Sequence, residues 1–176
     1  MRFETKYLQE KRLTLRRLHR FLNDMVFNNE LDEDIIIDIQ DINEYKDEGD
    51  IYNDAICGIR PRHKDHSIPL EDLYKLDNSE IEIATAILFD VRFIEDVGKL
   101  KTQKMQILLL ARIMLHEMFH QYCRANGIDD KGDHDDQWYE IARQHGLEHI
   151  VDDDGTEWEI IERVRAGVLL NLFRLR

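Results

Sequence analysis

Residues 105–120 read MQILLLARIMLHEMFH, a mostly apolar run that closes on two histidines and a glutamate. Long unbranched and leucine side chains favour a helix, and a helix this apolar is normally buried. Polar groups on a buried helix cost free energy unless they have partners or a use. The stretch therefore predicts a central buried helix with a functional site near its end. Thr102 is a suitable N-cap for it, and Asn126-Gly127 a suitable end.

His116, Glu117 and His120 have the HExxH spacing of zinc hydrolases. Residues four apart lie on one face of a helix, so the two imidazoles can bind one zinc ion at about 2.0–2.1 Å. Glu117 follows the first ligand directly and can reach a water at the ion as general base. The alternative interpretation is three ordinary polar residues near a helix end, including a hydrogen-bonded core histidine.

A catalytic zinc usually takes three protein ligands, so a third must come from elsewhere. Cys123 and Asn126 stand where a metzincin has glycine and histidine, which excludes that pattern. Glu140 on a following helix is one candidate. His134 is favoured because it precedes an amphipathic segment and has acidic neighbours that can hold its second ring nitrogen. Those neighbours are Asp133, Asp135 and Asp136.

The remaining hydrophobic patterns predict a single α+β domain over residues 1–176. We expect Arg60-Pro61 to end the second of three short strands. The predicted elements are a helix over 6–27, strands over 35–39, 51–59 and 83–93, a polar loop over 61–82, and helices over 135–145 and 157–174.

The composition, with 43% apolar and 35% charged residues, is typical of a globular protein. No apolar run approaches the roughly 20 residues of a membrane span, and the first residues lack an apolar signal core. We therefore expect a cytoplasmic protein with no membrane partner. Cys57 and Cys123 are expected to be reduced thiols.

A formal net charge of −13 opposes nucleic-acid binding unless positive charge is segregated. Some basic residues do gather over Lys11–Arg20 and near the end of the chain, although solvated helix faces explain them more simply. DNA is therefore expected to be a weak partner at most. His63 and His66 lack a third ligand and are interpreted as surface histidines.

Around its histidine motif the chain resembles the SprT-like (Spartan-type) zinc metallopeptidase domain. That family has an apolar helix with HExxH, then a histidine, an aromatic residue four positions later and a glycine twelve positions after that histidine. Here these are residues 114–120, His134, Trp138 and Gly146. The upstream turn Phe27–Leu31 also fits, and the resemblance covers roughly residues 10–147, leaving 157–174 as a C-terminal helical extension.

The resemblance implies a zincin-like (minigluzincin-like) fold. In it a small, mostly antiparallel sheet of about three strands packs on the active-site helix and flanking helices. It also implies that an edge strand near 84–93 binds the substrate backbone by strand addition. The chain departs from the family pattern in two respects: it has His134-Asp135 where many members have His-Gly, and it lacks the Cys-x-x-Cys pairs of a zinc ribbon. The missing ribbon and the acidic balance weaken the transfer of the family's DNA-associated role.

The function predicted on this basis is a zinc-dependent endopeptidase acting on protein or peptide substrates. His116, His120 and His134 would hold Zn²⁺, and Glu117 would assist the attack of a zinc-bound water on the peptide bond. Two alternatives remain open: a zincin-like binding protein with a structural zinc, and DNA-linked proteolysis. The candidates for an additional oxyanion donor are Tyr122, Tyr139, Arg143 and His145.

Overall fold

The first helix, α1, spans Lys6–Phe27, as its amphipathic pattern predicts. A computed structural model describes residues 6–44, 53–64, 78–128, 140–141 and 143–144. Leu15, Leu18 and Leu22 recur at helical spacing and are buried in the core. Asn28 and Asn29 follow the helix at positive φ, a backbone conformation that asparagine tolerates.

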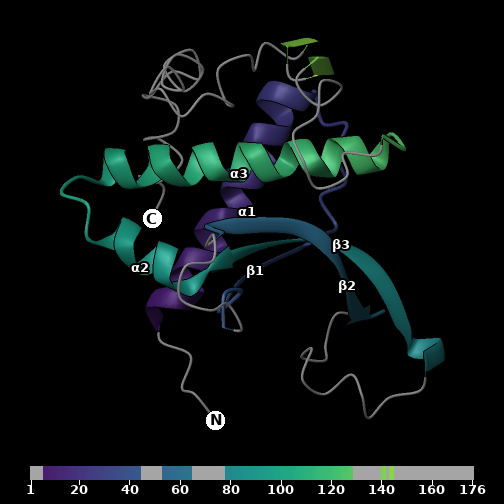
Figure 1. The fold of residues 1–176 in the computed structure, drawn as a ribbon, viewed down its shortest axis with the longest axis horizontal. Helices are drawn as coiled ribbons and strands as arrows, with labels where there is room; N and C mark the ends of the chain where they lie inside the picture. Colours follow the sequence, from purple (N-terminus) through teal and green to yellow (C-terminus); the bar gives the residue numbers. More distant parts are fainter. Residues whose placement is uncertain (1–5, 45–52, 65–77, 129–139, 142, 145–176) are drawn as a thin grey trace.

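Three strands form one sheet in the order β1-β3-β2. They are β1 (Ile36–Gln40), β2 (Ala55–His63) and β3 (Ile81–Asp90). The β1–β3 pair is parallel and the longer β2–β3 pair is antiparallel. The sheet is thus mixed, whereas a mostly antiparallel sheet was expected. The three-strand α+β architecture itself is confirmed (Figure 1).

The central position of β3 corrects the expectation that this strand forms an edge. β1 pairs along one side of β3 and β2 along the other. Successive residues Ala86, Ile87, Leu88 and Phe89 are all buried, so both faces of β3 are covered. In the described sheet the antiparallel edge strand is therefore β2.

β2 also runs through Arg60-Pro61, where the second strand was expected to stop. Proline cannot donate a hydrogen bond to the ladder, but an edge strand has one side on which no donor is needed. Part of the predicted polar loop over 61–82 is consequently strand. A short 3-10 helix, η2 (Asn78–Glu80), leads into β3.

A short helix that the sequence analysis did not predict, α2 (Val91–Gly98), follows β3 directly. Asp90 ends the strand and caps the helix, because its carboxylate accepts hydrogen bonds from the backbone N–H groups of Arg92 and Phe93. The buried Asn43 amide donates to the same carboxylate at 2.8 Å. The predicted third strand over 83–93 was therefore too long at its end.

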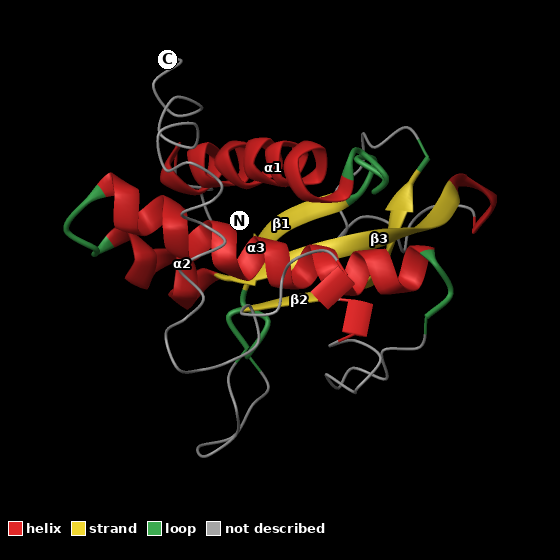
Figure 2. Ribbon diagram, turned by 90° about the horizontal axis from the view of Figure 1, so that it is seen from above, coloured by secondary structure: helices red, strands yellow, loops and turns green. Residues whose placement is uncertain are grey.

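The last long helix, α3 (Gln103–Ala125), lies over the strands in the view from above (Figure 2). It contacts β2 and β3, and α1 packs against both α3 and β1. The core lies between these elements. Its sheet side includes the register partners Ile37 with Ile87 and Ile39 with Phe89. Within the described residues, no helix has both the length and the apolar character to span a membrane.

Candidate metal centre

The helix that carries the histidines is defined at both ends as predicted. The Thr102 hydroxyl accepts a hydrogen bond from the backbone N–H of Met105. At the other end Gly127 takes a φ of 67°, and the backbone N–H of Ile128 donates to the carbonyl of Cys123 at 2.8 Å. This glycine-terminated end satisfies carbonyls that the helix leaves open. The last two turns of α3 are thus held in a fixed geometry.

His116 and His120 lie one turn apart on α3, and their Nε2 atoms are 3.3 Å apart. The rings are half-buried, with centroids 5.1 Å apart and planes at 65°. Two nitrogens bound to one tetrahedral zinc at 2.0–2.1 Å would be about 3.3 Å apart. The separation of the two nitrogens therefore fits two ligands of one ion.

Glu117 lies beside this pair and is only 6% exposed. A buried carboxylate is costly unless it is paired, hydrogen-bonded or bound to a metal. The position of Glu117, on a helix whose other buried residues are mostly apolar, fits the sequence-based expectation of a chemical role.

His116 and His120 belong to a row of residues spaced four apart along α3, a helix that contacts the edge strand β2. Arg112 begins this row and Arg124 ends it, at steps of four residues. Arg112 acts electrostatically on Asp54, just before β2. Partial burial raises the pKa of Asp54, Arg112 opposes the rise, and nearby acidic groups add to it. At the other end, a guanidinium nitrogen of Arg124 lies 4.0 Å from where a side chain on Gly58 would begin. Along α3 the histidine pair therefore lies between the interaction of Arg112 with Asp54 and the approach of Arg124 to Gly58 of β2.

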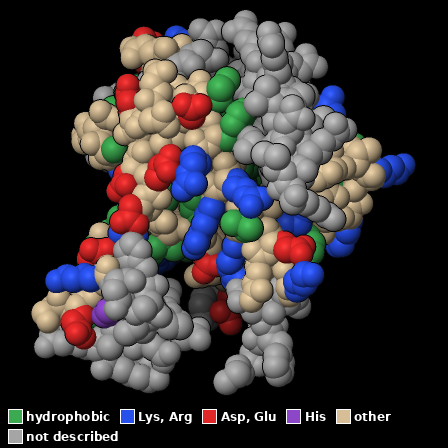
Figure 3. Space-filling model, turned by 180° about the vertical axis from the view of Figure 1, so that it is seen from behind, with side chains coloured by type: hydrophobic (Ala, Val, Ile, Leu, Met, Phe, Trp, Pro, Cys, Tyr) green, Lys and Arg blue, Asp and Glu red, His purple; other side chains and the backbone are tan. Residues whose placement is uncertain are grey.

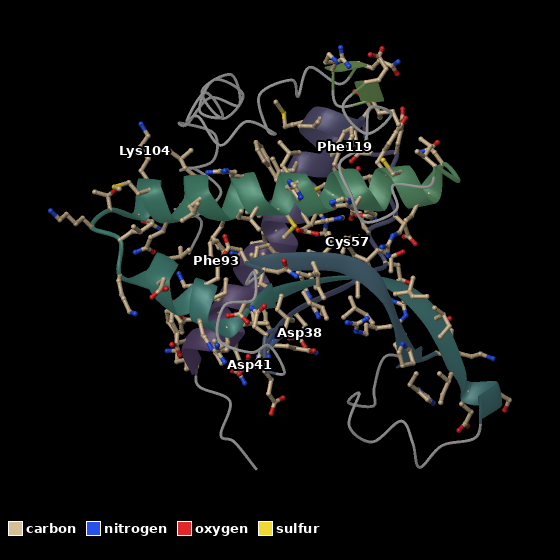
Figure 4. All side chains as sticks on the ribbon, viewed as in Figure 1. Asp38, Asp41, Cys57, Phe93, Lys104 and Phe119 are labelled. Carbon is tan, nitrogen blue, oxygen red and sulfur yellow. The ribbon has the colours of Figure 1, made fainter. Side chains whose placement is uncertain are left out.

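The side-chain view agrees with this placement. Figure 4 shows Lys104 near the start of α3 and Phe119 near its other end, with Cys57 of β2 below the same part of the helix as Phe119. The turn that bears the histidines is consequently the end of α3 that lies away from α2.

Two sets of contacts hold this end of α3 against α1. The Gln121 side chain bonds the buried His19 ring at 2.8 Å and donates to the carbonyl of Asp32 at 2.8 Å. Phe27 lies 6.1 Å from Phe119 and 5.7 Å from the Tyr122 ring, between centroids. Because Gln121 and Phe119 are the neighbours of His120 in sequence, these contacts fix the stretch of helix backbone that carries the second histidine.

The burial of His19 predicts a loss of stability in acid. Burial lowers its pKa below the ordinary 6.5, while the Gln121 bond, Glu33 and Asp32 raise it and Arg20 lowers it. The unfolded chain then takes up the proton first, so the stabilisation is complete above pH 6.5 and is lost as pH falls below that value. We expect the free energy of unfolding, measured in urea, to fall from pH 7.5 to 5.5.

A His19→Gln variant should show a shallower fall over the same range, because the group that titrates is gone. At pH 8 the difference between variant and wild type reports only on packing and the bond to Gln121. Equal slopes for the two proteins between pH 7.5 and 5.5 would show that His19 does not cause the acid sensitivity.

The candidate third ligand His134 lies outside the described residues, as do Asp133, Asp135 and Asp136. The other candidate, Glu140, is described: its carboxylate pairs with Arg143 at 3.3 Å. Within the described ranges, no three His, Cys, Asp or Glu side chains are close enough to hold an ion together. Glu140 therefore does not join the histidine pair in this structure.

Two of the candidate oxyanion donors, Tyr122 and Arg143, lie in the described part of the chain, and both make contacts within the fold. The Tyr122 ring is stacked in the aromatic contacts between α1 and α3, and Arg143 is in the ion pair with Glu140. Tyr139 and His145 lie outside the described residues, as do Trp138 and Gly146. The predicted helix over 157–174 and His66 lie outside them too, and His63 is half-buried at the end of β2.

Several basic residues of α1 are neutralised by the chain's own acidic groups. Arg12 pairs with Asp38, and Arg20 pairs with Glu33 at 2.9 Å. On the face of the molecule turned away in Figure 1, basic side chains are interspersed with acidic ones (Figure 3). Such a surface attracts phosphate less than a segregated basic patch does.

A second strand was predicted over 51–59, but neither its edge position nor the place of Arg60 within it was expected. The unbroken apolar run Ala86–Phe89 was the available signal, because a strand that is apolar on both faces is a central one. In comparisons with family models, curated proteins and solved structures, the chain has no match.

Proposed function

We propose that the protein is a zinc-dependent endopeptidase of the SprT-like type. The observation that carries the proposal is the 3.3 Å separation of the His116 and His120 Nε2 atoms, with the buried Glu117 beside them. Two imidazoles at this spacing fit the donor set of a catalytic zinc, and the resemblance supplies His134 as the third ligand.

In this proposal different residues of the chain bind the metal, transfer the proton and position the ligands. Zinc bound to the histidines would polarise a peptide carbonyl and lower the pKa of a water molecule. The Glu117 carboxylate takes a proton from the attacking water and passes it to the leaving nitrogen. Gln121 and Phe119, through their contacts with α1, fix the helix backbone that carries His120.

The substrate of this endopeptidase would bind in extended form along β2. The resemblance assigns the substrate backbone to an edge strand, and β2 is the antiparallel edge strand that α3 contacts. Pairing through backbone groups gives affinity with little dependence on sequence. Since the basic groups of α1 are partly paired, we propose peptide rather than DNA as the main partner.

Zinc content tests the proposal directly. Purified protein, analysed by native mass spectrometry after reconstitution, should carry one equivalent of zinc. His116→Ala and His120→Ala should lose it, and His134→Ala should weaken it, because each removes one ligand. His63→Ala, at the end of β2, is the control and should keep the metal. Absence of zinc from wild-type protein, both as purified and after reconstitution, would refute the proposal.

A further inference from the structure

Two arginines converge over a glycine next to the histidine turn. Arg60 lies on β2 and Arg124 lies in the last turn of α3, four residues after His120. If Gly58 carried a Cβ, the Nη1 atom of Arg60 would be 3.6 Å from it and that of Arg124 4.0 Å. Both guanidinium groups therefore border the same space, which exists because residue 58 has no side chain.

The two charges stand out in a chain with a net charge of −13. Several other arginines are paired: Arg62, for example, binds Asp34 and Glu82. In the part of the chain that the structure describes, neither Arg60 nor Arg124 makes an ion pair. Among the described residues, the Arg60 guanidinium donates one hydrogen bond, to the neighbouring carbonyl of Ile59. Like charges at close range repel, so the arrangement favours a bound anion.

The helix dipole and solvation by water explain only in part why two arginines without an ion pair lie close together. Arg124 suits the negative end of the α3 helix dipole, but that role does not require a second arginine beside it. Arg16 and Arg17 on α1 also lack an ion pair among the described residues, and they are exposed to water, as Arg124 is. What distinguishes Arg60 and Arg124 is that elements distant in sequence bring them to one point.

We propose that Arg60 and Arg124 form a carboxylate-binding subsite over Gly58 for peptide substrates. This rests on the proposed function, because the ligand is taken to be a peptide lying along β2. Arginine binds carboxylates through paired, charge-assisted hydrogen bonds, which the planar group of an acidic residue fits. The carboxylate can come from an aspartate or glutamate side chain or from the C-terminus of the peptide.

The distance from the subsite to the histidines determines how many residues separate the acidic group of the peptide from the cleaved bond. Arg124 is about 6 Å along the helix axis from His120. An extended peptide advances about 3.4 Å per residue, so a peptide that runs alongside α3 would place the carboxylate about two residues from the cleaved bond. The subsite thus adds a preference for acidic peptides to a backbone-directed site.

Peptide binding provides a test that does not depend on turnover. Fluorescein-labelled peptides with glutamate or glutamine at each of three positions on either side of a central bond are titrated into Glu117→Gln protein, with anisotropy as the readout. Each is made with a free and an amidated C-terminus, which separates the two sources of carboxylate. One glutamate position, or the free C-terminus, should bind roughly tenfold tighter than its neutral counterpart.

Arg60→Gln and Arg124→Gln, each made in the Glu117→Gln background, should remove this preference while leaving the binding of neutral peptides within about twofold. Gly58→Glu, which supplies a competing carboxylate within the chain, should remove it too. Arg16→Gln makes the same change of charge on α1 and should keep it. Equal binding of acidic and neutral peptides, or an equal loss with Arg16→Gln, would overturn the subsite. Failure of wild-type protein to cleave any of the peptides would count against the endopeptidase and leave the subsite to be judged by binding.

Discussion

Replacing Glu117 with glutamine should abolish peptide hydrolysis and leave zinc bound. The amide has the shape of the carboxylate but cannot accept a proton from water, so a loss of about 10²–10⁴-fold in kcat is expected. The side chain is only 6% exposed, and removing a buried charge should not destabilise the fold. Cleavage of a quenched fluorescent peptide library measures the first effect, and native mass spectrometry the second.

Glu140→Gln is the matched control, because it changes the charge equally at an exposed residue of the described region. Its activity should stay close to that of wild type. If Glu117→Gln protein cleaved peptides at the wild-type rate, the general base would have to be another group. If the wild-type protein bound zinc but cleaved neither unfolded nor DNA-crosslinked proteins, a binding protein with a structural zinc would be favoured.

The helices that carry the site could be predicted because their signals are local. The leucine spacing of α1 indicated the observed range Lys6–Phe27. Thr102 and Gly127 marked the two ends of α3 through capping rules that depend on a few neighbouring residues. The spacing of His116 and His120 likewise fixes their proximity on any regular helix.

The sheet was harder to predict because strand order depends on partners distant in sequence. Nothing near Pro61 shows that β2 is an edge strand, and only there is a proline tolerated within the strand. Val91 and Phe93 favour strands by type, so they concealed the helix that Asp90 caps. Asp90 followed by apolar residues at helical spacing was the signal that could have revealed α2.

The convergence of Arg60 and Arg124 could not be derived from the sequence at all. The two residues are separated by most of the chain's folded core, and only the packing of α3 against β2 brings them to Gly58. The same holds for the bond between His19 and Gln121, which joins α1 to α3. Side chains that meet through tertiary packing have no periodic pattern in the sequence to indicate it.

Phe27→Ala should cause a large loss of stability and should make the stability of the folded protein depend on added zinc. Phe27 is 1% exposed at the end of α1 and stacks near Phe119 and Tyr122 on the histidine turn of α3. Removing a buried phenylalanine ring leaves a cavity and typically costs about 3–5 kcal/mol. Urea denaturation of metal-free protein measures this loss. Phe93→Ala is the control, because Phe93 is half-buried on α2 and should cost less.

Zinc should restore part of the stability lost in Phe27→Ala protein. An ion that binds only the folded chain stabilises it by mass action, by about 2.7 kcal/mol at a free concentration one hundred times Kd. The midpoint in urea should therefore rise with added zinc in Phe27→Ala protein, and not in the same variant carrying His116→Ala. If zinc left the urea midpoint of Phe27→Ala protein unchanged, metal binding would not stabilise the fold of this variant. A cost no greater than that of Phe93→Ala would show that Phe27 does not anchor the histidine turn to α1.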